Sequence, residues 1–290
     1  MTKVDHFESQ FRAAEREPFR YEPPVFRRIL FVTDLSGEEA RSLEQRIKGF
    51  LAHLPIGTAE AGDQDWALVL GENFHTEKEL LDLVEKHEPD LVVTYRHLHS
   101  EGWRWHYSLG EYVDVLVGAT NLPVLLLPHP RAGLEADHSL LDTNRVMVMT
   151  DHLTGAHRLV NCGVAFCQAR GRLILSHLED QATFEHYVKT FGKIPSIDTE
   201  NARDALREQL IKEPEDYIES CRSLLEQERP SLEIQAIVGF GKRLPTYRAL
   251  IEEHEVDLLV LNATKDDQLA MRGLVYPLAV GLRHIPLALI

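Results

Sequence analysis

The sequence contains only three cysteines among its 290 residues. Their odd number, and the lack of a close Cys-x-x-Cys pair, disfavour a zinc site or a dithiol redox centre. Cys162, Cys167 and Cys221 all fall in helical patterns. We therefore expect them to be buried free thiols in a reducing compartment.

An excess of basic residues is also missing. The chain has 31 Lys and Arg against 46 Asp and Glu, a formal net charge of -15. This charge repels phosphate backbones and anionic lipids, so nucleic-acid and membrane partners are disfavoured. No apolar run approaches the roughly twenty residues of a membrane-spanning helix, and residues 1–24 lack the apolar core of a signal peptide. We expect a cytoplasmic protein.

What the sequence does contain is an internal repeat. The segment Leu83–Val93, LVEKHEPDLVV, returns as Leu250–Val260, LIEEHEVDLLV. Arg28–Asp34 likewise matches Arg145–Asp151. Such dense similarity without low-complexity sequence indicates two related domains in one chain. The second copy is longer by about fifty residues in its front part, so the first copy is expected to lack one strand and one crossover helix there.

Strand and helix patterns alternate in both copies, which predicts parallel sheets covered on both faces. We expect an extension over 1–24, a shortened first domain over 25–128, a linker over 129–144 and a second domain over 145–290. A helical insertion is predicted at about 180–229, with breaks near Pro195 and Pro214.

Several features recur in the same order in both halves. An opening strand ends in Asp34 or Asp151, a glycine follows the middle strand (Gly71 or Gly239), and a closing helix runs from Gly110 or Gly273 to a strand that begins with proline. Taken together, they resemble the universal stress protein family in its tandem form. The resemblance implies two adenine nucleotide alpha hydrolase-like parallel α/β domains, packed as a pseudo-dimer through the closing strands Pro123–Leu127 and Pro286–Ile290.

The resemblance also indicates where ATP or AMP would bind. In binding members an aspartate at the end of the first strand approaches the adenosine, which points to Asp34 and Asp151. A loop of pattern G-x2-G-x9-G-[S/T] cradles the phosphates, because glycines allow close backbone approach. Asp34 and Asp151 have an alternative interpretation as helix caps or turn formers. Gly71 and Gly239 likewise have an alternative interpretation as turn glycines.

This chain departs from the phosphate loop in both halves. Counting back from Gly110 places Ser100 and His97 at the earlier glycine positions, and Glu111 replaces the Ser or Thr. In the second half Gly273 is followed by Leu274, and the loop before it is about four residues shorter. Ala263 and Val260 stand there at the earlier glycine positions. We therefore expect ATP to bind weakly or not at all.

The segment 96–106, RHLHSEGWRWH, occupies the place of the first phosphate loop. One interpretation is an anion pocket built from Arg96, Arg104 and histidines. Another is a metal site formed by His97, His99 and His106 with a fourth ligand such as Glu101. A third is that Trp103 and Trp105 cover the sheet edge or an interface.

The weak candidates for a nucleotide or anion site are Asp34, Gly71, Arg96, Gly110, Asp151, Gly239 and Gly273. The sequence has no nucleophile elbow, Walker loop or H-E-x-x-H motif, so we predict no enzyme, with a weak ATPase as the alternative. The expected function is a non-enzymatic stress-response or regulatory binding protein that acts on a protein partner or as a homodimer. Its rival is an ATP- or AMP-binding switch that uses the Arg and His loop.

Overall fold

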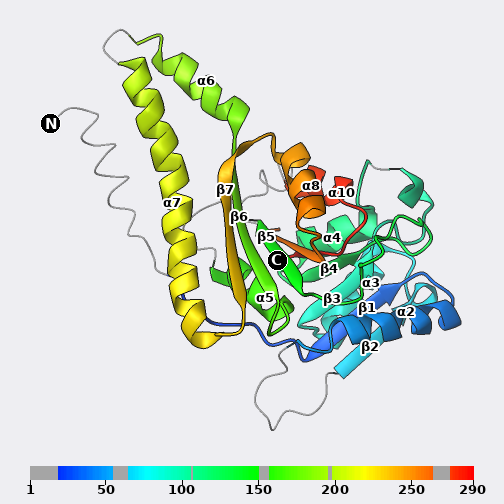
Figure 1. Cartoon of the computed structure of the whole chain (residues 1–290). Coiled ribbons are helices and arrows are strands. Elements are labelled where there is room, and N and C mark those ends of the chain that lie inside the picture. The colour runs from blue at the N-terminus through cyan, green and yellow to red at the C-terminus, as the bar shows by residue number, and fades with distance from the viewer. Residues whose placement is uncertain (1–18, 55–64, 106, 150–156, 195–197, 264–274) are drawn as a thin grey trace.

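The computed structural model describes residues 19–54, 65–105, 107–149, 157–194, 198–263 and 275–290. They form an α/β fold around one mostly parallel nine-stranded sheet, in the order β2-β1-β3-β4-β9-β8-β5-β6-β7 (Figure 1). The described helices include none with the length and apolar character of a membrane-spanning segment.

The first half supplies four strands in the order β2-β1-β3-β4, all parallel. β3 and β4 are buried along their whole length, which explains why they are apolar at every position except Thr94 and the Tyr95 hydroxyl. The elements are β1 (Arg28–Thr33), α2 (Gly37–Phe50), β2 (Asp65–Leu70), η1 (Gly71–Asn73), α3 (Glu77–His87), β3 (Leu91–Tyr95), η2 (Gly102–Arg104), α4 (Glu111–Ala119) and β4 (Val124–Leu127).

The second half supplies five parallel strands in the order β9-β8-β5-β6-β7. Its elements are β5 (Arg145–Met149), α5 (His157–Phe166), β6 (Arg172–Asp180), α6 (Gln181–Phe191), α7 (Thr199–Glu228), β7 (Glu233–Gly241), α8 (Arg243–Glu253), β8 (Leu258–Leu261), α10 (Tyr276–Gly281) and β9 (Leu287–Leu289). The alternation predicted from the sequence is therefore present in both halves.

One antiparallel pair joins the two sets of strands. β4 pairs with β9, with Val124 opposite Leu289 and Leu126 opposite Leu287. Both strands are fully buried. Each covers an apolar edge that would otherwise be open to aggregation. The two closing strands therefore lie side by side at the centre of the sheet.

The sequence repeat forms the same joint twice. Glu88, the C-cap of α3, and Glu255, two residues after the last residue of α8, both have left-handed backbone conformations, with φ of 43° and 47°. Two residues later, an aspartate accepts a backbone N–H at the start of the first strand of its half, Arg28 N–H to Asp90 at 2.9 Å and Arg145 N–H to Asp257 at 2.8 Å. The same arginines form ion pairs with Glu88 (2.9 Å) and Glu255 (2.6 Å). The residues that the copies share are thus structural.

The halves differ at the outer edge of the sheet. β2 pairs directly with β1, in the position that β6 takes beside β5. The described part of the first half has no counterpart of β7, the outermost strand of the second half. The strand predicted to be missing is therefore an edge strand. As a result, Gly71 follows a strand next to β1, whereas Gly239 lies inside β7, one strand further from β5.

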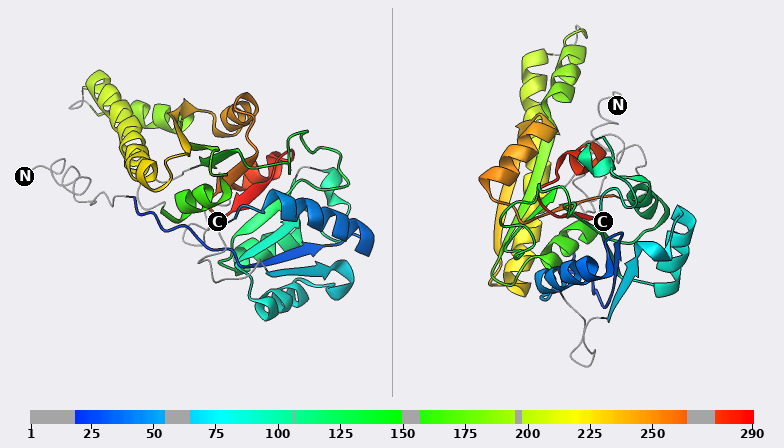
Figure 2. Two further views of the ribbon diagram at one scale, coloured as in Figure 1. Left: turned by 60° about the horizontal axis from the view of Figure 1, so that its bottom comes forward. Right: turned by 90° about the vertical axis from the view of Figure 1, so that its right-hand side faces the viewer.

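The predicted insertion forms α6 and α7, a helical hairpin that extends well beyond the sheet (Figure 2). The predicted helix break near Pro214 is wrong, because α7 runs without interruption through this residue. Proline removes one backbone hydrogen bond and crowds the preceding turn. The buried side chains of Tyr217, Ile218, Cys221 and Leu225 fix the following turns against the core. The expected break near Pro195 lies outside the described residues.

The described end of the N-terminal extension crosses the second half before entering β1. The Asn161 side chain in α5 accepts the Glu22 N–H at 3.0 Å and donates to the Arg20 carbonyl at 2.8 Å. Phe26 packs against Phe166 with ring centroids 5.3 Å apart. This segment therefore ties the start of the first half to a helix of the second.

Candidate functional site

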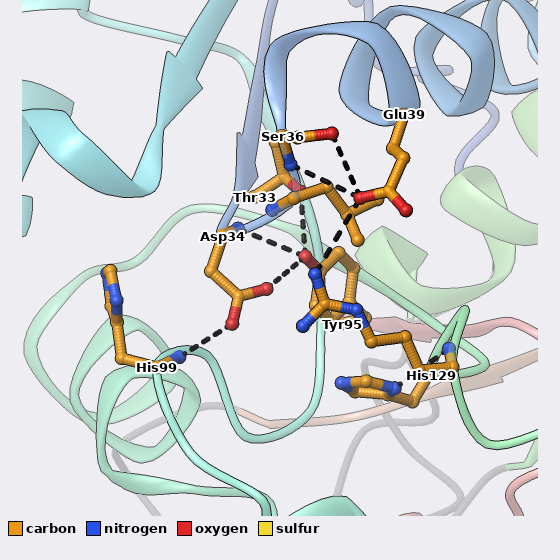
Figure 3. A network of polar contacts seen from close by, with 9 residues as sticks. Thr33, Asp34, Ser36, Glu39, Tyr95, His99 and His129 are labelled. Carbon is orange, nitrogen blue, oxygen red and sulfur yellow. Dashed lines mark hydrogen bonds and ion pairs between the residues drawn. The ribbon is translucent and has the colours of Figure 1, made fainter.

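Asp34 follows β1 at the carboxyl edge of the first half, where open parallel sheets bind ligands. One carboxylate oxygen accepts the Tyr95 hydroxyl and the other accepts the His99 N–H at 2.9 Å (Figure 3). The Tyr95 oxygen also accepts the Asp34 N–H at 3.0 Å. Tyr95 is fully buried, and burial raises the pKa of its phenol. Asp34 is therefore held by groups of its own chain.

A small cavity of about 310 Å³ opens beside Asp34. It contains two carboxylates and two imidazoles but no lysine or arginine. The residues that line it are Asp34, Leu35, Ser36, Gly37, Leu70, Gly71, Glu72, His75 and His99. Its charge favours a neutral or cationic polar group over a phosphate.

The start of α2, which borders this cavity, already has an acidic partner. Ser36 is the N-cap residue, so the helix-cap interpretation of Asp34 does not describe its contacts. Glu39 accepts the Ser36 N–H at 3.4 Å and the Ser36 hydroxyl at 3.0 Å. A carboxylate at this position meets the positive end of the helix dipole and leaves less attraction for an anionic ligand.

The loop after β3 folds back over the site. His97 and His99 both have left-handed backbones, with φ of 59° and 56°. The His97 N–H donates to the Leu109 carbonyl at 3.0 Å. A Cβ on Gly110, which has φ of 95°, would lie 2.9 Å from the His97 backbone. Gly110 thus accommodates the chain's own loop.

Arg96 does not line the cavity and is 3% exposed. Its guanidinium donates to the carbonyls of Ala279 (2.5 Å) and Leu282 (2.6 Å) at the end of α10. Burial lowers the pKa of this group to about 9, so it remains cationic at neutral pH. A cation at a helix C-terminus compensates the unpaired carbonyls and the negative end of the dipole. Arg96 therefore joins the two halves.

The loop is held from the other side through Trp103 by His129 and Arg283, two residues that the sequence did not indicate. The Trp103 indole stacks on the His129 ring at 5.0 Å, and His129 meets Tyr95 edge-on at 5.0 Å. The Trp103 carbonyl accepts a hydrogen bond from Arg283. Burial lowers the pKa of His129 to about 4, so its ring is neutral at pH 7. His129 lies in the predicted linker, and no sequence motif marks it.

Of the remaining predicted residues, Gly71 joins Asp34 at the cavity. A Cβ on Gly71 would lie 2.8 Å from His99 and 3.0 Å from Asp34, so Gly71 permits a close approach. Gly239 has open space around it. Asp151 and Gly273 lie outside the described residues, as does His106. Across the described ranges, no three His, Cys, Asp or Glu side chains are arranged to hold a metal ion.

The aromatic residues of the loop divide into two groups. Trp103 covers His129, as expected for a residue that closes the sheet edge. Trp105 is largely exposed. Arg104 is also exposed and pairs with Glu101 at 3.1 Å. Neither arginine of the predicted anion pocket lines the cavity.

Comparisons with known proteins were made from sequence and from structure. No family model matches the sequence, and no curated protein matches it. A solved protein of unknown function from Pseudomonas aeruginosa PAO1 has a TM-score of 0.51 at 11% identity, over 91% of this chain and 92% of that chain. Another, from Pseudomonas aeruginosa UCBPP-PA14 and provisionally described as a universal stress protein, has a TM-score of 0.49 at 13% identity, over 91% and 93%. The first likeness shows that the fold is shared over nearly the whole chain.

Proposed function

We propose that this chain is a tandem universal stress protein that acts in the cytoplasm as a non-enzymatic regulatory binding protein. Its two domains would correspond to residues 25–128 and 145–290, packed as a pseudo-dimer. The proposal is supported by the antiparallel pairing of β4 with β9 and by the joint that the repeat forms in both halves. Its partner would be a protein or a second copy, since the charge of -15 disfavours nucleic acid and anionic membranes.

The observation that carries the non-nucleotide role is the position of His97. Its backbone lies against Gly110, where the family pattern would place a phosphate. Arg96, the obvious substitute for glycine amides, is engaged with carbonyls of α10. The carboxylates of Asp34 and Glu72 line the remaining cavity and would repel a triphosphate. The first half thus has a nucleotide loop that is closed by its own residues.

Isothermal titration calorimetry and equilibrium dialysis with ATP and with AMP test this proposal. We expect no binding in the micromolar range. Micromolar binding that is lost in Asp34→Ala would instead establish the rival function, a nucleotide-dependent switch. Asp151→Ala is the matched variant for the second half. ATP hydrolysis abolished by either substitution would establish an enzyme and overturn the proposal.

A further inference from the structure

The outer edge of β7 has the properties of a pairing edge. We propose that β7 pairs antiparallel with β7 of a second copy of this chain, joining the two nine-stranded sheets into one. β7 is at the opposite edge of the sheet from β2 and its neighbour β1 (Figure 1), and Asp34 directly follows β1. The inference therefore goes beyond the proposed function and stands whether or not the chain binds nucleotide.

The hydrogen-bonding pattern shows which groups of β7 point outward. In a parallel ladder, the N–H and C=O of one residue point to the same side. The Glu233 N–H donates to the Gly171 carbonyl at 3.0 Å, so Glu233 and every second residue after it face β6. Ile234, Ala236, Val238 and Phe240 therefore direct their backbone groups outward. α7 lies beside β7, yet no residue in the described ranges bonds to these outward groups.

β7 also lacks the features that keep sheet edges apart. Natural edge strands are blunted by proline, by charged side chains, by bulges or by short length. β7 has nine residues, and the stretch Ile234–Gly241 contains neither a proline nor a charge. None of its residues is fully buried. A soluble protein that keeps such an edge needs a partner for it.

A second copy fits this edge in a defined register. When Ile237 lies opposite Ile237 of the second copy, Ile234 faces Phe240 and Ala236 faces Val238. All four outward residues then form hydrogen-bonded pairs. Ile234 with Phe240 is a favourable pair of a β-branched and an aromatic side chain. Glu233 comes opposite Gly241 of the other copy, so the single charge of the strand meets no like charge across the pair.

The chain already extends its sheet in this way, because β4 and β9 form an antiparallel pair of closing strands. The opposite edge of the sheet is less suited to pairing. β2 is three residues shorter than β7. The outward N–H of Leu70 already donates to the Asn73 side chain at 2.9 Å. β2 therefore serves as the matched control edge.

Analytical ultracentrifugation of the full chain tests the proposal. We expect the wild type to be a dimer. Val238→Pro should raise the dissociation constant of this dimer by about tenfold or more, because proline removes an outward N–H and leaves the ladder with β6 intact. Leu68→Pro removes an outward N–H of β2 and should leave the dimer unchanged. A monomeric wild type, or a dimer indifferent to Val238→Pro with circular dichroism unchanged, overturns the proposal.

Disulfide crosslinking tests the register and does not depend on the stability of the proline variants. In a non-hydrogen-bonded antiparallel pair the Cα atoms lie about 4.5 Å apart, within the range of a disulfide. Ile237→Cys should therefore crosslink two copies under mild oxidation, whereas Ala236→Cys should not. The three native cysteines are buried and will not interfere. Equal crosslinking of both variants, or none in Ile237→Cys, would falsify the register and with it the paired edge.

Discussion

The guanidinium of Arg96 lies 2.6 Å from the carbonyl oxygen of Leu282, so a residue after the third strand caps a helix near the end of the chain. Arg283 makes the return contact by donating to the Trp103 carbonyl. The loop that closes the first-half site is thus fixed by the second half. Any opening of that loop has to break contacts with α10 as well.

Replacing Arg96 should therefore destabilise the whole chain. Arg96→Ala leaves the carbonyls of Ala279 and Leu282 unpaired in a buried place, and we expect a loss of about 2 to 4 kcal/mol. Urea unfolding measures the change. Arg104→Ala removes an exposed arginine of the same loop and should change stability by less than about 0.5 kcal/mol. Equally small losses of unfolding free energy in both variants would mean that the contacts of Arg96 with α10 contribute nothing to stability.

Gly110 should tolerate no side chain. Gly110→Ala places a methyl 2.9 Å from the His97 backbone and strains a residue with φ of 95°, so we expect a loss of roughly 2 to 3 kcal/mol. Gly118→Ala is the control, because Gly118 lies in α4, the helix that Gly110 caps, and has open space around it. That change should stabilise the chain by up to about 1 kcal/mol. The midpoint temperature of thermal unfolding should fall in Gly110→Ala and rise in Gly118→Ala.

The repeated aspartates should differ in importance. The Asp257 side chain is 1% exposed and the Asp90 side chain 31%. Asp257→Ala removes the buried carboxylate that accepts the Arg145 backbone N–H and pairs with its guanidinium at 2.9 Å, and leaves Arg145 with the exposed Glu255. It should therefore cost about 3 kcal/mol. Asp90→Ala should cost roughly 1 kcal/mol, because its arginine is better solvated. Comparable losses in urea unfolding would contradict this ranking.

Stability should fall in mildly acidic solution partly because of His129. Burial lowers the folded-state pKa of this imidazole from 6.5 to about 4. Between these values the unfolded chain binds the proton and the folded chain does not. The contribution of His129 is thus complete above pH 6.5 and is lost as the pH falls towards 4, by roughly 1 kcal/mol per pH unit. His129→Phe keeps an aromatic ring against Trp103. It should reduce the slope of the unfolding free energy against pH by roughly 1 kcal/mol per pH unit between pH 4 and 6.5. An unchanged slope would show that His129 does not cause the loss of stability in acid.

The sequence was sufficient to predict the elements whose causes are local. Runs such as Leu91–Val93 and Val124–Leu127 are apolar because their strands are buried on both faces. The repeated Glu and Asp after α3 and α8 were recognisable as shared structure because the same short-range joint forms twice. The expected loss of a strand from the first half also followed from length alone, although its place at the sheet edge did not.

Features that depend on distant parts of the chain were not predictable. Pro214 indicated a helix break, but packing of the following turns against the core outweighs the lost hydrogen bond. Gly71 and Gly239 looked equivalent, yet their strands take different positions in the sheet. The side-chain direction of Arg96 is set by a helix nearly two hundred residues further along the sequence. No local pattern carries that information.

The three thiols all lie in the second half, Cys162 in α5, Cys167 just after it and Cys221 in α7. Each is buried, and burial raises each thiol pKa to about 12. They will therefore react with an alkylating reagent only after the surrounding helices open. The first half carries no thiol at all. The rate of labelling in the unmodified protein thus reports the opening of one half alone, and comparison with global unfolding would show whether the two halves open together.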